Sequence, residues 1–130
     1  MKDLEQFARE VFLNQPFSQY LGAELVNVGD GSAVISPVIR EIHTQQHGFV
    51  HGGVISYLAD NALTFAGGLA LGGDALTSEF KINFVRPAKG GTLLANASTL
   101  SKGKRQAVCQ CKVVCDEMLV AIAQGTIVKA

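Results

Sequence analysis

Residues 47–60 combine the residue types needed to polarise and attack a carbonyl group. Two histidines and three glycines precede a long apolar segment, and a single carboxylate, Asp60, lies within that segment. Glycine at a helix start permits a tight bend and leaves backbone N–H groups free, and the helix dipole favours negative charge there. A carboxylate on an apolar helix is costly unless it is paired, solvated or used. We therefore predict an oxyanion site at Gly52 and a catalytic carboxylate at Asp60.

Both features also have ordinary structural explanations. Gly52 and Gly53 could simply form a tight helix entry. Asp60 shares a narrow polar stripe with Ser56 and Thr64, each four residues away, and could be bonded to either or to a partner chain. If it is catalytic, Asp60 could attack directly or activate water.

The surrounding pattern predicts the elements that position these residues. Helical spacing of apolar residues predicts an amphipathic helix over 3–13, ended by Pro16, and a buried helix over 53–69. Alternation and turn residues predict strands over 23–28, 32–39, 77–86, 93–100, 105–115 and 118–128. Pro37 would place the second strand at an edge or bulge, and the last four strands would form a meander. The expected fold is a single α+β domain over 1–130, with a curved antiparallel sheet wrapped around one long central helix and a short N-terminal helix.

The composition fits a small protein with its own core. Of 130 residues, 48% are hydrophobic and 17% are charged, so a partner subunit could cover some apolar surface. Eleven basic and eleven acidic residues cancel, which argues against nucleic-acid binding by bulk charge. The polar beginning of the chain and the interruption of its longest apolar segment by Asp60 and Asn61 indicate neither a signal peptide nor a membrane span. We expect a cytoplasmic protein.

Three cysteines share one predicted strand. Cys109, Cys111 and Cys115 have the same parity, so they should lie on one face as small core side chains. Neighbours on one face of a strand are badly placed for a disulfide with each other. Zinc binding or redox use are the alternatives.

Three histidines are spaced by four residues, which raises the possibility of a metal site. Gly48 and Gly52 argue against a continuous helix through His43, His47 and His51, and no acidic ligand lies nearby. We expect no metal.

The chain resembles the hotdog-fold thioesterases that act on acyl-CoA. Within the 4-hydroxybenzoyl-CoA thioesterase superfamily, it is most similar to the group of the phenylacetate-pathway thioesterase. The likeness is carried by residues 47–48, 51–53, 58–60 and 84–91, and the order of elements matches from about Pro16 to the end.

The resemblance implies specific catalytic roles. The Gly52 backbone N–H corresponds to an oxyanion donor, and Asp60 to the nucleophile or general base. Thr77, with Ser78 beside it, matches a hydroxyl residue that helps to hold the water or the carboxylate. Gln45 stands where the group often has asparagine, so the same amide is carried on a longer arm.

The resemblance also implies substrate contacts. His51 would order the loop or the Gly52 peptide, and His47 would line the substrate entrance near Gly53. Cations in turns suit the phosphates of the coenzyme A nucleotide, although each could be an ordinary solvated residue. These cations are Arg86, Lys89, Lys102, Lys104 and Arg105. The aromatic candidates for shaping the acyl pocket are Tyr57, Phe65 and Phe80.

The spacing of Gly52 and Asp60 predicts an oligomer. Eight residues of helix span about 12 Å, so one thioester carbon cannot contact both groups on a single helix. Two antiparallel copies of the helix would bring Gly52 of one chain to Asp60 of the other. We therefore predict at least a two-fold dimer with composite sites, and we expect a tetramer.

The resulting hypothesis is an acyl-CoA thioesterase that converts a small or medium acyl-CoA, aromatic or aliphatic, to free acid and coenzyme A. It implies no cofactor apart from the coenzyme A of the substrate, and no nucleic-acid or membrane partner. One alternative is a non-catalytic acyl-CoA-binding hotdog protein, which the Gln45 departure would favour. Another is a hotdog hydratase or dehydratase, but those relatives use a catalytic histidine and the predicted helix has none.

Overall fold

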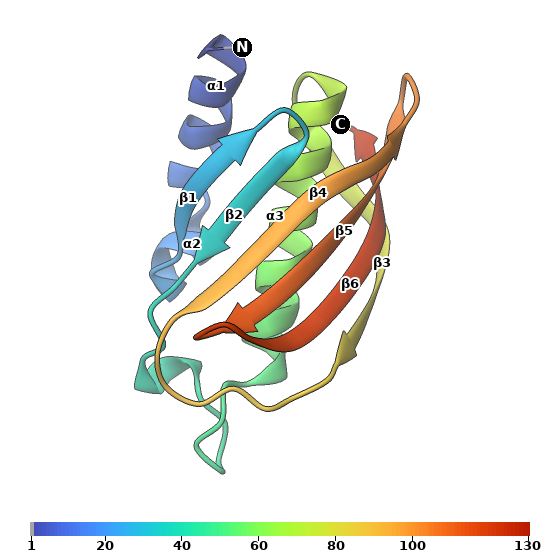
Figure 1. Ribbon diagram of the computed structural model, residues 1–130. Coiled ribbons are helices and arrows are strands. Elements are labelled where there is room, and N and C mark those ends of the chain that lie inside the picture. The colour runs from blue at the N-terminus through green and yellow to red at the C-terminus, as the bar shows by residue number, and fades with distance from the viewer. Residues whose placement is uncertain (1) are drawn as a thin grey trace.

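The computed structural model describes residues 2–130 (Figure 1). Its elements in chain order are α1 (Lys2–Leu13), α2 (Pro16–Leu21), β1 (Glu24–Gly29), β2 (Ser32–Ser36), the short 3₁₀ helix η1 (Glu41–His43), α3 (Gly52–Leu71), β3 (Ala75–Phe84), β4 (Leu93–Lys102), β5 (Gln106–Cys115) and β6 (Met118–Lys129).

One antiparallel sheet curves around α3. Its six strands follow the order β1-β2-β4-β5-β6-β3, and α1 and α2 lie beside the β1 end of the sheet (Figure 1). This arrangement is the hotdog fold, so the expected α+β architecture is confirmed.

The central helix is buried on most of its circumference because its side chains are apolar nearly all round. By length and hydropathy α3 could cross a membrane, but 67% of its apolar window is buried inside the fold, as in the core helix of a soluble domain. Gly52, Ser56, Asp60 and Thr64, spaced by four residues, form a half-exposed stripe along α3. The sheet therefore leaves open the face of the helix that carries the candidate catalytic groups.

Two predictions about the sheet were wrong. β2 is not an edge strand: it lies between β1 and β4 and ends at Ser36, just before Pro37 could remove a ladder hydrogen bond. The last four strands are not a meander, because β3 pairs with β6 and not with β4. The segment after β3 crosses below the start of α3, where Val50 N–H donates to Ala88 O at 2.9 Å, and it enters β4 on the far side (Figure 1).

A second helix was missed. Pro16 does not only end the first helical pattern; it begins α2, where its fixed φ and missing N–H suit the first turn. Gly22 closes α2 in the left-handed conformation at φ 70°. This short helix buries Ser18 and Leu21.

The cysteines behave as small core residues. Cys109, Cys111 and Cys115 are buried and unpaired, as their common face predicted. Burial raises the pKa of all three thiols, that of Cys111 to about 12. Thiols held in the protonated form are poor nucleophiles and poor metal ligands.

The outer edge of β3 has no partner strand among the described residues. Leu76 is 60% exposed and Phe84 is 54% exposed at the two ends of this strand. A bulge between Thr77 and Glu79 leaves Ser78 out of register, with its side chain exposed.

Candidate active site

The start of α3 leaves one backbone donor unused. His51 is the N-cap: its Nδ1 accepts from Gly53 N–H at 2.7 Å, and its carbonyl accepts from Val54 and Ile55. The four N–H groups without an i→i−4 partner belong to residues 51–54, and His51 N–H donates to His43 O at 2.8 Å, so three of the four are satisfied. Gly52 N–H has no acceptor within residues 2–130. A free donor at a helix N-terminus is suited to bind an oxyanion.

The two glycines at the start of α3 have different surroundings. A Cβ at Gly53 would lie 2.9 Å from His51 Nδ1, so glycine lets the imidazole approach closely. A Cβ at Gly52 would meet only the Phe84 ring, at 3.5 Å, which is ordinary contact. Glycine at position 53 thus permits the close His51 cap, whereas a small side chain at position 52 would have room beside Phe84.

The loop before α3 is organised by Gln45. Its Oε1 accepts from His47 N–H at 2.5 Å and from Phe49 N–H at 3.3 Å, which leaves the amide N–H groups as its remaining polar function. The His47 side chain is exposed at this loop. Lys89 Nζ lies 5.7 Å from the centre of the Phe49 ring, which brings a cation to the same end of α3.

His43 is a buried residue that connects the loop before α3 to the rest of the fold. It is fully buried, its Nδ1 accepts from Arg40 N–H at 2.9 Å, and its Nε2 donates to Leu21 O at 2.8 Å. Its carbonyl accepts from His51 N–H, so it ties the loop to α2. Both ring nitrogens are engaged, which gives His43 a structural role.

Asp60 carries a buried oxygen without a partner. Its Oδ1 is enclosed and makes no hydrogen bond within residues 2–130. The Thr64 hydroxyl donates to the Asp60 backbone carbonyl at 2.8 Å, so it does not neutralise the carboxylate. This oxygen therefore keeps its lone pairs free to accept a hydrogen bond from a water molecule or a substrate group.

The donor and acceptor roles of the Thr64 and Thr77 hydroxyls are defined by their hydrogen bonds. Thr64 has one hydroxyl hydrogen and uses it on the Asp60 carbonyl, so the 2.5 Å contact between Thr64 Oγ1 and Thr77 Oγ1 must be donated by Thr77. Thr77 Oγ1 then keeps its lone pairs free as acceptors. Ser78 next to it is exposed on the bulge.

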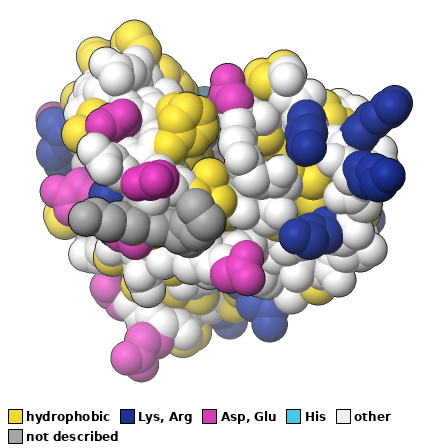
Figure 2. Space-filling view, turned by 90° about the horizontal axis from the view of Figure 1, so that it is seen from above, with side chains coloured by type: hydrophobic (Ala, Val, Ile, Leu, Met, Phe, Trp, Pro, Cys, Tyr) yellow, Lys and Arg dark blue, Asp and Glu magenta, His cyan; other side chains and the backbone are white. Residues whose placement is uncertain are grey.

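The candidate cations are divided between the two ends of α3. Arg86 Nη1 donates to Leu119 O at 3.1 Å and lies, like Lys89, near the N-terminal end. Lys102 Nζ donates to Ala70 O at 3.0 Å, at the C-terminal end, where Lys104 and Arg105 form the tip of the β4–β5 hairpin. Figure 2 shows Lys and Arg side chains gathered on one side of that end. A 20-residue helix spans about 30 Å, so one chain does not bring these two groups together.

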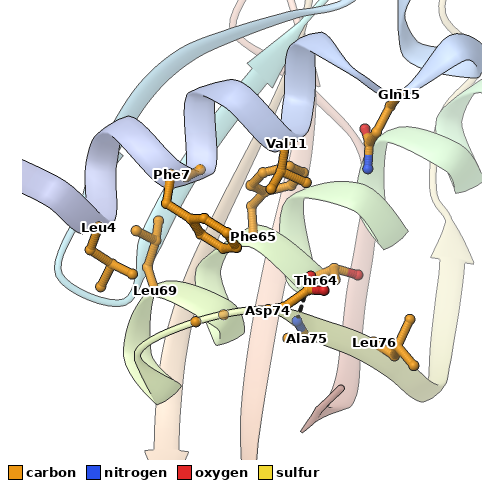
Figure 3. Close-up of a pocket in the computed structure, with 13 residues that line it drawn as sticks. Leu4, Phe7, Val11, Gln15, Thr64, Phe65, Leu69, Asp74, Ala75 and Leu76 are labelled. Carbon is orange, nitrogen blue, oxygen red and sulfur yellow. Dashed lines mark hydrogen bonds between the residues drawn. The ribbon is translucent and has the colours of Figure 1, made fainter.

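Sequence reasoning missed a cavity under α1. It has a volume of about 210 Å³ and lies between α1, the second half of α3 and the beginning of β3 (Figure 3). Its lining residues are Leu4, Phe7, Ala8, Val11, Gln15, Thr64, Phe65, Gly68, Leu69, Gly73, Asp74, Ala75 and Leu76. The sequence feature that could have indicated this cavity was the apolar face of the predicted 3–13 helix, because such a face must pack against another part of the protein. Of the three aromatic candidates, Phe65 lines this cavity, whereas Tyr57 and Phe80 do not.

Tyr57 belongs to a polar network beside the cavity. The Ser18 hydroxyl donates to Gln15 Oε1 at 2.6 Å, so Tyr57 must donate to Ser18 Oγ across their 2.5 Å contact, while Asn61 donates to the Tyr57 oxygen at 3.2 Å. Burial raises the pKa of Tyr57, partly offset by these hydrogen bonds. Asn61 and Gln15 also exchange hydrogen bonds through their amides. The network fixes α2 and Gln15 against α3.

Comparison with known proteins decides the family. The model of the thioesterase superfamily matches residues 47–122, which contain α3 and strands β3 to β5.

The chain belongs to the thioesterase superfamily.

Its relatives support the same assignment. The enzyme is 30% identical over 125 residues to acyl-coenzyme A thioesterase PaaI of Escherichia coli, covering 92% of this chain and 86% of the relative. It is 29% identical to a 1,4-dihydroxy-2-naphthoyl-CoA hydrolase of Listeria monocytogenes, covering 82% of this chain and 89% of the relative. The solved structure of the E. coli PaaI protein from the phenylacetic acid degradation operon superimposes with a TM-score of 0.91 at 28% identity, covering 98% of this chain and 93% of that one. The protein is therefore a thioester hydrolase of the hotdog fold.

Proposed function

We propose that the enzyme hydrolyses acyl-CoA thioesters, with Gly52 N–H as the oxyanion donor and Asp60 as the general base. The observation that carries this proposal is the unsatisfied Gly52 N–H at the start of α3, on the same open stripe as the unpaired Asp60 carboxylate. Acyl-CoA is the substrate class because the named relatives act on coenzyme A esters.

The proposed reaction uses both groups in one step. Asp60 takes a proton from water, and the water oxygen bonds to the acyl carbon while Gly52 N–H stabilises the developing oxyanion. The carbon–sulfur bond then breaks, and coenzyme A leaves as a thiolate that receives the proton from Asp60. The products are a free carboxylic acid and coenzyme A thiol.

The second acceptor for the water would be Thr77. A water molecule has two hydrogens, one for the Asp60 carboxylate and one for the free lone pair of Thr77 Oγ1. Its own lone pair then faces the acyl carbon. Because Thr77 directs its hydrogen to Thr64, its lone pairs are free to accept from this water, which supports water activation by Asp60.

The two groups would come from two chains. Within one chain they are separated by eight residues of continuous helix, about 12 Å. We propose a two-fold dimer in which the unpaired β3 edges and the open faces of α3 meet, so that Gly52 of one protomer faces Asp60 of the other. The exposed Leu76 and Phe84 on β3 supply apolar surface for that contact.

The test is release of coenzyme A thiol from a panel of acyl-CoA substrates. Wild type should release thiol, and Asp60→Asn should lower kcat by about 100-fold or more while keeping the fold, because the amide cannot accept the proton. Asp30→Asn, at the exposed β1–β2 turn, is the matched control and should retain activity. A folded Asp60→Asn enzyme with near-wild-type turnover would disprove the assignment.

The same panel separates the alternatives. A non-catalytic binder would bind acyl-CoA without thiol release, and a hydratase would change acyl-chain unsaturation without releasing thiol. A single turnover in ¹⁸O-labelled water tests direct attack by Asp60: label in the protein would identify an anhydride that water opens at the aspartyl carbon, whereas activated water puts all label into the free acid.

A further inference from the structure

We infer that the cavity under α1 is the acyl-binding pocket and that α1 sets which acyl groups fit. This inference rests on the proposed thioesterase function, because it assigns the substrate's acyl group to this space.

The cavity reaches Thr64, one helical turn from Asp60. Thr64 lines it, and Thr64 follows Asp60 by one helical turn on the same face of α3. The Thr64 hydroxyl is bonded to both the Asp60 carbonyl and Thr77. An acyl group with its carbonyl carbon at Asp60 would thus pass Thr64 and enter the cavity within about 5.4 Å, one turn of helix.

The lining matches an apolar acyl group. Figure 3 shows Phe7 and Val11 of α1 facing Phe65 of α3 across the space, with Leu4 and Leu69 at one end and the polar side chains of Thr64 and Gln15 elsewhere on its wall. An apolar cavity of about 150 Å³ accepts benzene, so one of about 210 Å³ should hold a phenyl ring with one or two further carbons, or a chain of similar volume. We therefore assign arylacyl groups such as phenylacetyl and linear acyl groups of about six to eight carbons as the preferred substrates.

The α1 wall lies outside the segment that the family model matches. The thioesterase superfamily model matches residues 47–122, so the α3 side of the cavity lies inside the shared segment and the α1 side lies outside it. α1 is held to the rest of the molecule by Phe12, which packs edge-on against Phe65 at 5.7 Å between ring centroids, and by Arg9, whose Nη1 donates to Leu25 O. The common machinery and the specificity wall are thus carried by different elements.

Val11→Phe is the discriminating variant. Val11 is half-buried and lines the cavity, so a phenyl ring there would fill the acyl space without entering the core. Leu13→Phe is the matched control, since Leu13 lies on the same helix but is 67% exposed and outside the cavity. Both variants and wild type are tested for kcat/KM with acetyl-, hexanoyl-, octanoyl- and phenylacetyl-CoA, and for binding of the non-hydrolysable thioether S-hexyl-CoA by calorimetry. Circular dichroism and thermal melting establish that each variant is folded.

The expected result is a change of profile. In wild type, kcat/KM should rise by about threefold to fourfold per methylene up to the pocket length, from the transfer free energy of each buried methylene. Val11→Phe should lower kcat/KM for hexanoyl- and phenylacetyl-CoA by about 10-fold or more, weaken S-hexyl-CoA similarly, and leave acetyl-CoA within about twofold. Leu13→Phe should change none of these values.

The two proposals fail in different ways. If a folded Val11→Phe enzyme turns over with the wild-type chain-length profile and the wild-type affinity for S-hexyl-CoA, the acyl-pocket assignment is wrong. The thioesterase function would be unaffected by that result. Absence of thiol release from every substrate, together with S-hexyl-CoA binding that Val11→Phe weakens, would overturn hydrolysis and support the pocket. Absence of both thiol release and S-hexyl-CoA binding in wild type would overturn both.

Discussion

At the scale of single residues, the direction of one hydrogen bond determines what Thr77 can do. Its hydroxyl hydrogen goes to Thr64, because Thr64 directs its own hydrogen to the Asp60 carbonyl. Thr77 therefore offers only lone pairs to a water molecule, and it would orient that water for the proposed attack without competing for the Asp60 carboxylate.

We predict that Thr77→Val lowers kcat by about 10- to 100-fold, as for a lost positioning contact in general base catalysis. Valine has the same shape and favours strands, so the fold should be preserved. Thr77→Ser should recover most of the activity, because serine restores the acceptor. Steady-state kinetics with one acyl-CoA substrate measure both changes, and equal kcat values for Thr77→Val and wild type would exclude a role in the reaction.

Residue types alone identify Gly52 and Asp60 as candidate site residues in the sequence. A glycine pair at a helix start and a lone carboxylate on an apolar helix are locally unusual. Their unfavourable contribution to stability can therefore be recognised from the sequence without a structure. The partner of each polar group is not local. The His51 cap, the loop bonds of Gln45 and the burial of Asp60 Oδ1 all depend on where side chains finally point.

At the scale of elements, the β4–β5 hairpin presents two uncommitted cations. Lys102 is bound to Ala70 O, whereas the side chains of Lys104 and Arg105 are exposed and make no hydrogen bond or ion pair within residues 2–130. In the proposed dimer the antiparallel partner would bring the hairpin end of one chain toward the Gly52 end of the other. The hairpin is therefore suited to bind nucleotide phosphates of a substrate held at the composite site.

We predict that replacing Lys104 and Arg105 together with glutamine raises KM for acyl-CoA by about three- to tenfold, with little change in kcat. Exposed charge contacts are weak and act equally on ground and transition states. The increase should shrink at high salt because the charges are screened. A truncated thioester without the nucleotide is the control: an equal rise in its KM would mean that the hairpin does not act on the phosphates.

The elements themselves were largely predictable, and their neighbours were not. Alternation in residues 77–86 and 93–100 identifies strands because each strand has one covered face. It does not say which strand pairs with which, so β3 was assigned to a meander although it pairs with β6. The cavity was missed for a related reason: it requires α1 to lie against α3, which depends on the unpredicted α2 and its buried Ser18.

At the scale of the whole molecule, the proposed site is incomplete in one chain. Gly52→Val should block the oxyanion position and Asp60→Asn should remove the base, so each homodimer should be inactive. Mixing the two should restore about a quarter of wild-type turnover, because random exchange makes half of the dimers mixed and each mixed dimer has one intact site. Mass spectrometry verifies the exchange, and fully exchanged mixtures without activity would rule out the cross-subunit site.

Stability should fall at alkaline pH because of the buried thiols. Burial raises the pKa of Cys111 from 9.0 to about 12, so the folded state keeps its proton while the unfolded chain loses it. The stabilisation is complete below pH 9 and is lost as the pH rises toward 12, at up to about 1.4 kcal/mol per pH unit. Denaturant unfolding between pH 8 and 11 measures this slope. If the free energy of unfolding of Cys111→Ala falls with pH as steeply as that of wild type, the slope does not come from Cys111.

The pairing of β3 with β6 determines the order in which the sheet can form during synthesis of the chain. β3 is synthesised before residues 85–117, and β6, its one partner strand within residues 2–130, is synthesised after them. At about 5–20 residues per second, β6 follows β3 by several seconds, and until β6 is available β3 has neither edge bonded. The nascent protein should therefore need a chaperone most in that interval. Its sheet should be completed only when β6, which is synthesised last, pairs with β3.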